Sequence, residues 1–83
     1  MYKVLIVDDQ KILRYDLKRM KIWNETKDFV IAGEAENGRD ALKMLRSFSF
    51  DLLITDIKMP VIDGMELLKK VYEEKLCPCV VLL

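Results

Sequence analysis

The sequence predicts an α/β domain built on a parallel sheet of four strands. Four short apolar runs alternate with three longer segments in which apolar residues recur at helical spacing. The first run is uniformly apolar rather than alternating, which is typical of a strand buried on both faces of a parallel sheet. Because a helix lies in every connection, the order is βαβαβαβ and the strands are expected to run parallel.

The first strand and the first helix come at the start of the chain. The strand covers residues 4–7 and stops at Asp8 and Asp9. Residues 10–22 predict a helix because their apolar side chains fall at i, i+4 and i+7 on one stripe, which consists of Leu13, Leu17 and Met20. Basic residues, Arg14 among them, lie largely off this stripe.

A second strand and a second helix follow a predicted loop over residues 23–26. The strand, over 29–32, is weaker than the first and ends near Gly33. Asn37 can cap the N-terminus of the helix, and Asp40 falls in its first turn, where a negative charge suits the helix dipole. The buried side of this helix is expected to carry Ala41, Leu45 and Phe48.

The last third of the chain predicts two strands around a third helix. A strand over 52–55 is followed by Asp56, and Met-Pro and Asp-Gly pairs mark residues 59–64 as a loop. The third helical stripe consists of Met65, Leu68, Val71 and Tyr72. The fourth strand is expected over residues 80–83.

Composition and charge exclude several functional classes. With 83 residues the chain makes one domain at most, and its formal net charge of zero does not mark this segment as a nucleic-acid binder. The absence of histidine excludes histidine-based catalysis and metal ligation. Cys77 and Cys79 cannot complete a zinc site by themselves. Without a signal-peptide layout or an apolar run of about 18 residues, we expect a cytoplasmic protein with no membrane partner.

Three acidic residues are expected to meet at one edge of the sheet. Asp8 and Asp9 follow the first strand, and Asp56 follows the third. Open parallel sheets bind ligands outside the carboxyl ends of their strands, where the strand order reverses. If the two strands are neighbours, the three carboxylates repel one another and a hard cation such as magnesium would neutralise them. A carboxylate can also act as a nucleophile, which suggests Mg²⁺-assisted aspartyl phosphorylation.

Each acid also has an ordinary structural interpretation. An Asp-Asp pair before a helix is often a cap with a first-turn charge, and Asp56 alone could be a turn residue. A phosphohydrolase with an aspartate nucleophile would carry D-x-D-x-T where this chain has V-D-D-Q-K. A nicotinamide-binding domain needs G-x-G-x-x-G after its first strand, and no such run is present. The convergence of all three acids on one sheet edge therefore favours a functional site over three separate structural roles.

Three segments, VLIVDD, GEAENGRDAL and DLLITDIKMPVIDG, resemble the receiver domain of two-component response regulators over essentially the whole chain. The resemblance implies a truncated flavodoxin-like fold, (βα)3β, with strand order 2-1-3-4. It implies that Asp56 accepts a phosphoryl group from a sensor histidine kinase, so that the segment is a phosphoacceptor rather than an enzyme. It also implies a Mg²⁺ site formed by Asp8, Asp9, Asp56 and the backbone carbonyl of Lys58.

Receiver domains contain more than these elements. Residues 1–83 are therefore expected to be an incomplete receiver domain without the fourth helix, the fifth strand and the fifth helix. The phosphoryl-contacting Ser or Thr and Lys of the family would lie beyond Leu83. Val30, Ala32 and the loop around Trp23 are also similar to receivers joined to an AraC-type DNA-binding domain, which would make the full protein a regulator of transcription.

The expected topology leaves part of the sheet uncovered. Right-handed crossovers place the first helix on one face and the other two on the opposite face. A helix about 10 Å wide shields roughly two strands, so the same face of the third and fourth strands stays bare. The fourth strand is an apolar edge without charge, which invites pairing with another chain. We therefore expect a homo-oligomer, and an unphosphorylated interaction or oligomerisation module remains the alternative function.

Overall fold

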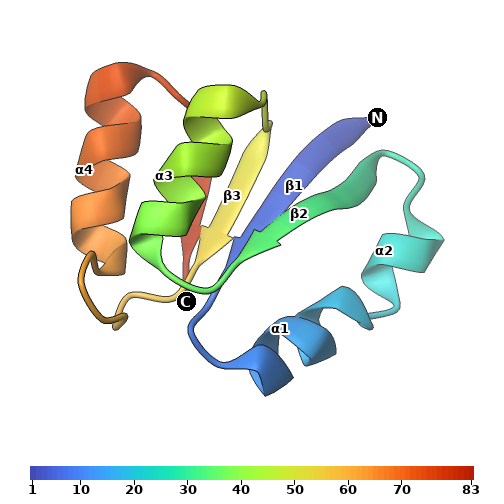
Figure 1. The fold of residues 1–83 in the computed structure, drawn as a ribbon. Coiled ribbons are helices and arrows are strands. Elements are labelled where there is room, and N and C mark those ends of the chain that lie inside the picture. Colours follow the sequence, from blue (N-terminus) through green and yellow to red (C-terminus); the bar gives the residue numbers. More distant parts are fainter.

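The computed structural model describes residues 1–83 and contains one four-stranded parallel sheet (Figure 1). The strands are β1 (Tyr2–Val7), β2 (Phe29–Ala35), β3 (Leu52–Thr55) and β4 (Cys79–Leu82). Their order in the sheet is β2-β1-β3-β4, and all three neighbouring pairs are parallel. The predicted fold class and strand order are therefore confirmed.

Four helices connect the strands, where the sequence predicted three. They are α1 (Lys11–Lys18), α2 (Ile22–Glu25), α3 (Gly38–Ser47) and α4 (Gly64–Glu74). The predictions of one helix over 10–22 and a loop over 23–26 are both wrong in detail, because the chain turns after α1 and forms a second short helix. The indole Nε1 of Trp23 donates a hydrogen bond of 2.6 Å to the carbonyl of Leu17, which holds the turn against the end of α1.

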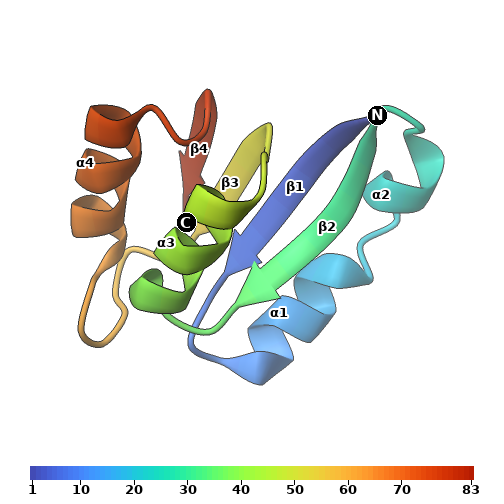
Figure 2. The same ribbon diagram turned by 45° about the horizontal axis from the view of Figure 1, so that its top comes forward.

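The helices cover both faces of the sheet. Figures 1 and 2 show α3 and α4 on one face and α1 with α2 on the other. The larger core lies under α3 and α4, where Leu5 and Leu53 of the sheet meet Leu45, Leu67 and Val71. All five of these side chains are almost completely buried, so burial of apolar surface on this face is the main stabilising contribution.

The opposite face of the sheet is only partly covered. Val4 and Ile6 of β1 are fully buried there, whereas α1 contributes no buried residue. In the stripe predicted for residues 10–22, Leu13 of α1 is 42% exposed and Met20, which follows α1, is 48% exposed. Because neither α1 nor the short α2 buries a side chain of its own, this face keeps apolar surface in contact with water, as the predicted topology implies.

Helix α3 begins where the sequence places it but buries a different set of residues. The side chain of Asn37 accepts a hydrogen bond of 2.7 Å from the backbone N–H of Asp40, which confirms the predicted cap. Phe48, predicted as buried, is 64% exposed because α3 ends before it and its backbone is already extended. Leu42 is buried in its place.

The predicted stripe of α4 also needs correction. Met65 and Tyr72 are exposed, and the buried stripe is Leu67 with Val71, four residues apart. The helix begins at Gly64, after Asp63, whose side chain accepts a hydrogen bond from the N–H of Glu66. The sequence pattern thus placed the helix correctly and misjudged the direction in which it faces the sheet.

Strand β2 is longer than predicted and runs past Gly33 to Ala35. Its pairing with β1 changes register between Val4 and Leu5 and then continues to the pair Val7–Ala35. Gly33 allows close packing here, since a Cβ atom at this position would lie 2.6 Å from Cε of Met44. None of the helices has the length and apolar character needed to cross a lipid bilayer.

Candidate functional site

Two acidic segments lie side by side at the carboxyl edge of the sheet because β1 and β3 are neighbours. The backbone N–H of Asp8 donates to the carbonyl of Ala35 at 3.1 Å, and that of Asp56 donates to the carbonyl of Val7 at 3.1 Å. Both bonds extend the sheet ladder beyond the last strand residue. The backbones that carry Asp8 and Asp56 are therefore fixed by the sheet itself.

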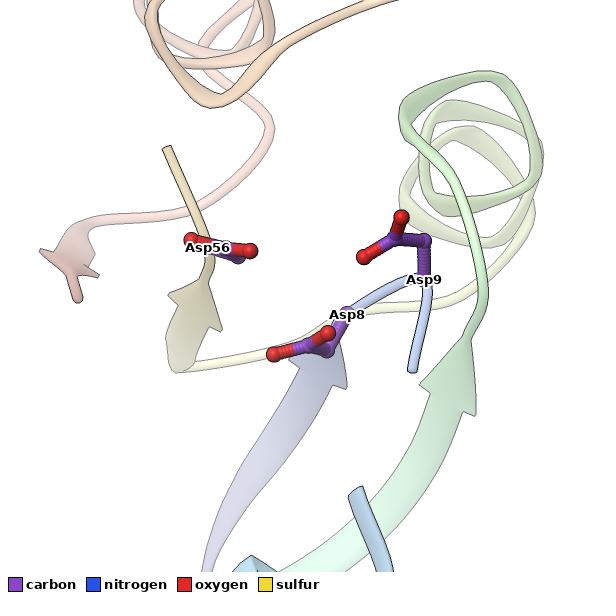
Figure 3. A group of neighbouring side chains, drawn as sticks. All are labelled: Asp8, Asp9 and Asp56. Atoms are coloured by element: carbon purple, nitrogen blue, oxygen red, sulfur yellow. The ribbon is translucent and has the colours of Figure 1, made fainter. Parts of the chain in front are cut away.

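The three predicted acids converge, and we call them the acidic site. One carboxylate oxygen from each of Asp8, Asp9 and Asp56 lies within 4.8 Å of the other two. Figure 3 shows the carboxylates of Asp8 and Asp9, at the end of β1, directed towards the side on which Asp56 lies. Asp8 is buried, Asp56 is half-buried and Asp9 is exposed, so the site opens to solvent on the side of Asp9.

Electrostatics in the acidic site disfavour three negative charges. Burial raises the pKa of Asp8, and the nearby charges of Asp56 and Asp9 raise it further, against the opposing hydrogen bond from the backbone N–H of Gln10. No basic side chain forms an ion pair with any of the three acids, since the ion pairs of the structure involve only Glu34 and Glu74. An oxygen-only donor set with unbalanced negative charge fits a hard divalent cation.

The loop after β3 holds the backbone of Asp56 tightly. The hydroxyl of Thr55 donates to the carbonyl of Asp56 at 3.0 Å. Gly64 packs against the same peptide, because a Cβ atom there would overlap the carbonyl oxygen of Asp56 and lie 2.7 Å from Cα of Ile57. The sequence marked Asp63–Gly64 as a turn and helix-start signal, and the family resemblance implied that Gly64 shapes the loop beside the site; the contact with the Asp56 peptide is the structural detail that it lacked. Lys58 is exposed in this loop, and the role of its carbonyl stays a prediction.

Arg14 is a residue of the site that the sequence pattern did not single out. Its Nη1 donates a hydrogen bond of 2.6 Å to the backbone carbonyl of Asp8. Its Nε donates to the carboxylate of Glu34 in β2 at 2.9 Å, and Lys18 donates to the other oxygen of Glu34. These two hydrogen bonds lower the pKa of Glu34. The spacing of Arg14 after Asp9 gave no physical signal of this contact, because it depends on where α1 turns.

A groove adjoins the acidic site on the face of the sheet that α1 covers. It has a volume of about 310 Å³. Asp8 and Asp56 line one part of it, and the remaining lining residues are Leu13, Asp16, Leu17, Met20 and Leu83. We call it the α1 groove. The acidic site is therefore continuous with a largely apolar surface between α1 and the end of β4.

Comparison with known proteins identifies the family. Residues 4–83 match the family model of the response regulator receiver domain. The chain is 39% identical over 82 residues to the transcriptional regulatory protein YdfI of Bacillus subtilis, which covers 99% of this chain and 38% of that protein. It is also 39% identical over 82 residues to a protein-glutamate methylesterase/protein-glutamine glutaminase of Carboxydothermus hydrogenoformans, covering 98% of this chain and 23% of that protein.

Solved structures agree with this match. The response regulator domain of Thermotoga maritima CheB superimposes with a TM-score of 0.83 at 29% identity, over 99% of this chain and 60% of that one. The receiver domain of AraT from Geobacillus stearothermophilus gives a TM-score of 0.76 at 30% identity, over 98% of this chain and 80% of that one. The chain spans 38% and 23% of the length of the two curated relatives named above. It belongs to the receiver domain family of response regulators, the phosphoacceptor modules of two-component signal transduction.

Proposed function

We propose that Asp56 is the residue of this chain that accepts the phosphoryl group from a sensor histidine kinase. One carboxylate oxygen of Asp56 would attack the phosphorus of a phosphohistidine. A phosphorus–oxygen bond then forms as the phosphorus–nitrogen bond breaks, and the imidazole leaves with its electron pair. The observation that carries this proposal is the convergence of Asp56 with Asp8 and Asp9 at a single sheet edge.

The surroundings of the three acids favour Asp56 over the other two as the nucleophile. Asp8 is only 4% exposed, and one of its oxygens already accepts the N–H of Gln10. Asp9 is exposed and follows the last residue of the β1 ladder, which leaves its side chain less constrained. Asp56 is half-buried on a peptide held by Val7 and Thr55, so its carboxylate combines access with a fixed position.

The acidic site would hold Mg²⁺ through Asp8, Asp9 and Asp56, with the backbone carbonyl of Lys58 as a further ligand. The fit rests on the donor chemistry, because carboxylate oxygens without a basic partner suit this cation. Bound Mg²⁺ would neutralise the negative charge of the acids and of the incoming phosphoryl group. The protein side chains supply the orientation, since Asp8 and Asp9 face the acceptor carboxylate from the neighbouring strand.

Acetyl phosphate with Mg²⁺ tests the acceptor directly, with intact mass spectrometry as the readout. The wild-type chain should gain the mass of one phosphoryl group, and Asp56→Asn should not. Asp63→Asn is a matched control in the same loop, because asparagine also caps helices well and Asp63 only caps α4. An adduct that persists in Asp56→Asn would overturn the assignment, and a wild-type chain that never gains one would overturn the phosphoacceptor role of this segment.

We also propose a second function, self-association of this segment. It is favoured by the apolar surface that the fold leaves uncovered. β4 pairs with β3 on one side only, and it carries Val81, which is 40% exposed. Leu83 is 58% exposed beside the α1 groove. A second copy could cover this edge and face. As an interaction module without phosphorylation, the segment would associate without any dependence on Mg²⁺, and a monomer in light scattering at micromolar concentration would refute association.

The whole protein is proposed to be a cytoplasmic response regulator in which this segment receives the signal and another part delivers the output. An AraC-type DNA-binding domain, and hence regulation of transcription, is the output that the likeness at Val30, Ala32 and the Trp23 loop suggests. The relative YdfI is a transcriptional regulatory protein. The relative named as a methylesterase is matched over only 23% of its length. We therefore propose that the segment is a phosphoacceptor and not itself an enzyme, and that residues 1–83 are the first part of a receiver domain.

A further inference from the structure

We propose that Arg14 is a positioning residue for the acidic site, which it serves by fixing the peptide between Asp8 and Asp9. This inference rests on the proposed function, because it concerns how the same three carboxylates are held for Mg²⁺. Arg14 joins three elements: it lies on α1, contacts the residue after β1 and pairs with Glu34 on β2. No other side chain donates a hydrogen bond to the backbone of Asp8.

The contact between Arg14 and Asp8 lies just beyond the point where the pairing of β1 with β2 ends. The N–H of Asp8 still belongs to the ladder through its bond to Ala35, and β1 pairs with β2 only as far as Val7. Arg14 binds the carbonyl of Asp8 at 2.6 Å. Because a peptide group is planar, fixing this carbonyl also fixes the N–H of Asp9 and the position of its Cα atom. The Asp9 side chain therefore starts from a fixed Cα atom, and only rotation about φ of Asp9 and its side-chain bonds is left to place the carboxylate.

Arg14 acts through the backbone rather than by neutralising the acids. Its ion-pair partner is Glu34 at 2.9 Å, and it forms no ion pair with Asp8, Asp9 or Asp56. The side chain of Arg14 is only 11% exposed, so its hydrogen bonds are partly protected from competing water. The planar guanidinium can reach both acceptors at fixed angles, which a lysine ammonium on a flexible stem cannot reproduce.

Glu34 completes the arrangement from the second strand. It accepts hydrogen bonds from Arg14 and Lys18 and so holds the guanidinium at the height of the Asp8 carbonyl. Helix α1 has no side-chain N-cap and no buried residue of its own. The orientation of Arg14 therefore depends on this ionic contact with β2 more than on the packing of α1.

The test is a titration with MgCl₂ alone, followed by the backbone amide NMR signals of Asp9 and Gln10. Arg14→Ala should weaken Mg²⁺ binding about 10-fold to 100-fold, the range measured when the groups that orient metal ligands are removed. The Mg²⁺ affinity of Arg14→Lys should fall between those of wild type and Arg14→Ala. Arg46→Ala is the matched control, since Arg46 also pairs with a glutamate, Glu74, and joins α3 to α4 far from the acidic site. The Mg²⁺ affinity of Arg46→Ala should equal that of wild type.

The outcomes separate this inference from the proposed function. A wild-type chain that binds no Mg²⁺ would refute the metal site itself. Wild-type affinity in a folded Arg14→Ala variant would refute only the role of Arg14. If Arg14→Ala does not fold, Glu34→Gln decides, because it keeps the guanidinium and removes its charged partner. Weaker Mg²⁺ binding in Glu34→Gln supports positioning, and unchanged binding overturns it. At saturating Mg²⁺, the phosphorylation rate of Arg14→Ala should return to that of wild type, since the acceptor Asp56 itself is intact.

Discussion

Val7 and Thr55 lie opposite each other in the parallel ladder of β1 and β3, and each is followed directly by an aspartate. This register brings Asp8 and Asp56 to the same height at the edge of the sheet. A shift of one residue would turn one of the two side chains to the other face of the sheet. The apolar residues of both strands fix the register, so the core of the fold also specifies the geometry of the acidic site.

Gly64→Ala should lower the free energy of unfolding by about 1–3 kcal/mol, the usual cost of forcing extra volume into a packed position. The added Cβ would meet backbone atoms of Asp56 and Ile57, which cannot move independently. Gly33→Ala is the matched comparison, because its Cβ would meet the flexible end of Met44. Chemical denaturation measures the free energy of unfolding of both variants. An equal loss of stability in the two would contradict this account of Gly64.

Asp8→Asn should raise the stability of the metal-free protein at neutral pH. The pKa of Asp8 is raised in the folded state, so the folded protein holds this proton more tightly than the unfolded chain does. The resulting stabilisation is fully present below the unfolded pKa of 3.8 and is lost as the pH rises through the folded pKa. Asparagine stays uncharged and still accepts the N–H of Gln10.

Unfolding curves of wild type and Asp8→Asn between about pH 3 and pH 7 would test this expectation. This range begins below the ordinary pKa of a carboxyl group and ends well above it. The advantage of Asp8→Asn should grow with pH and should shrink when Mg²⁺ is added, because the ion favours the ionised wild type. A constant difference across this range would show that Asp8 does not carry an unfavourable charge.

The sequence was sufficient to predict the sheet and the acidic site because both depend on short, local signals. Apolar runs located the strands, and the aspartates after two of them located the site. Burial within helices was less predictable. Tyr72 lies next to Val71 in the sequence, yet one is 82% exposed and the other 1%, because the crossing of α4 over the sheet selects the buried side.

The contact of Arg14 with the Asp8 carbonyl could not be predicted for a similar reason. It requires the length of α1, the turn after β1 and the extension of β2 to Glu34 to be known together. The predicted strand ended at residue 32, which left Glu34 in a loop. Tertiary pairing with β1 extended β2 beyond Gly33, and only that extension brings Glu34 beside α1.

Asn37→Ala should destabilise the protein by about 1 kcal/mol through loss of the cap of α3. Asn37 accepts the N–H of Asp40 at 2.7 Å, whereas Gln10, at the same position before α1, makes no side-chain cap. Gln10→Ala is therefore the matched control and should change the stability by only a few tenths of a kcal/mol, as surface substitutions usually do. Comparable losses in the two variants would mean that the Asn37 cap contributes little.

Val81→Lys should convert any oligomer of this segment into monomers. Val81 is 40% exposed on β4, whose free edge can pair with a second chain, and a lysine on an edge strand opposes such pairing through its charge. Tyr72→Lys is the control, because Tyr72 is 82% exposed on α4, on the opposite face of the sheet. Light scattering over a range of micromolar concentrations should show wild type and Tyr72→Lys associating to the same extent while Val81→Lys stays monomeric. If Tyr72→Lys alone abolished association, the interface would lie on the α3–α4 face, and the exposed edge of β4 would have no role in assembly.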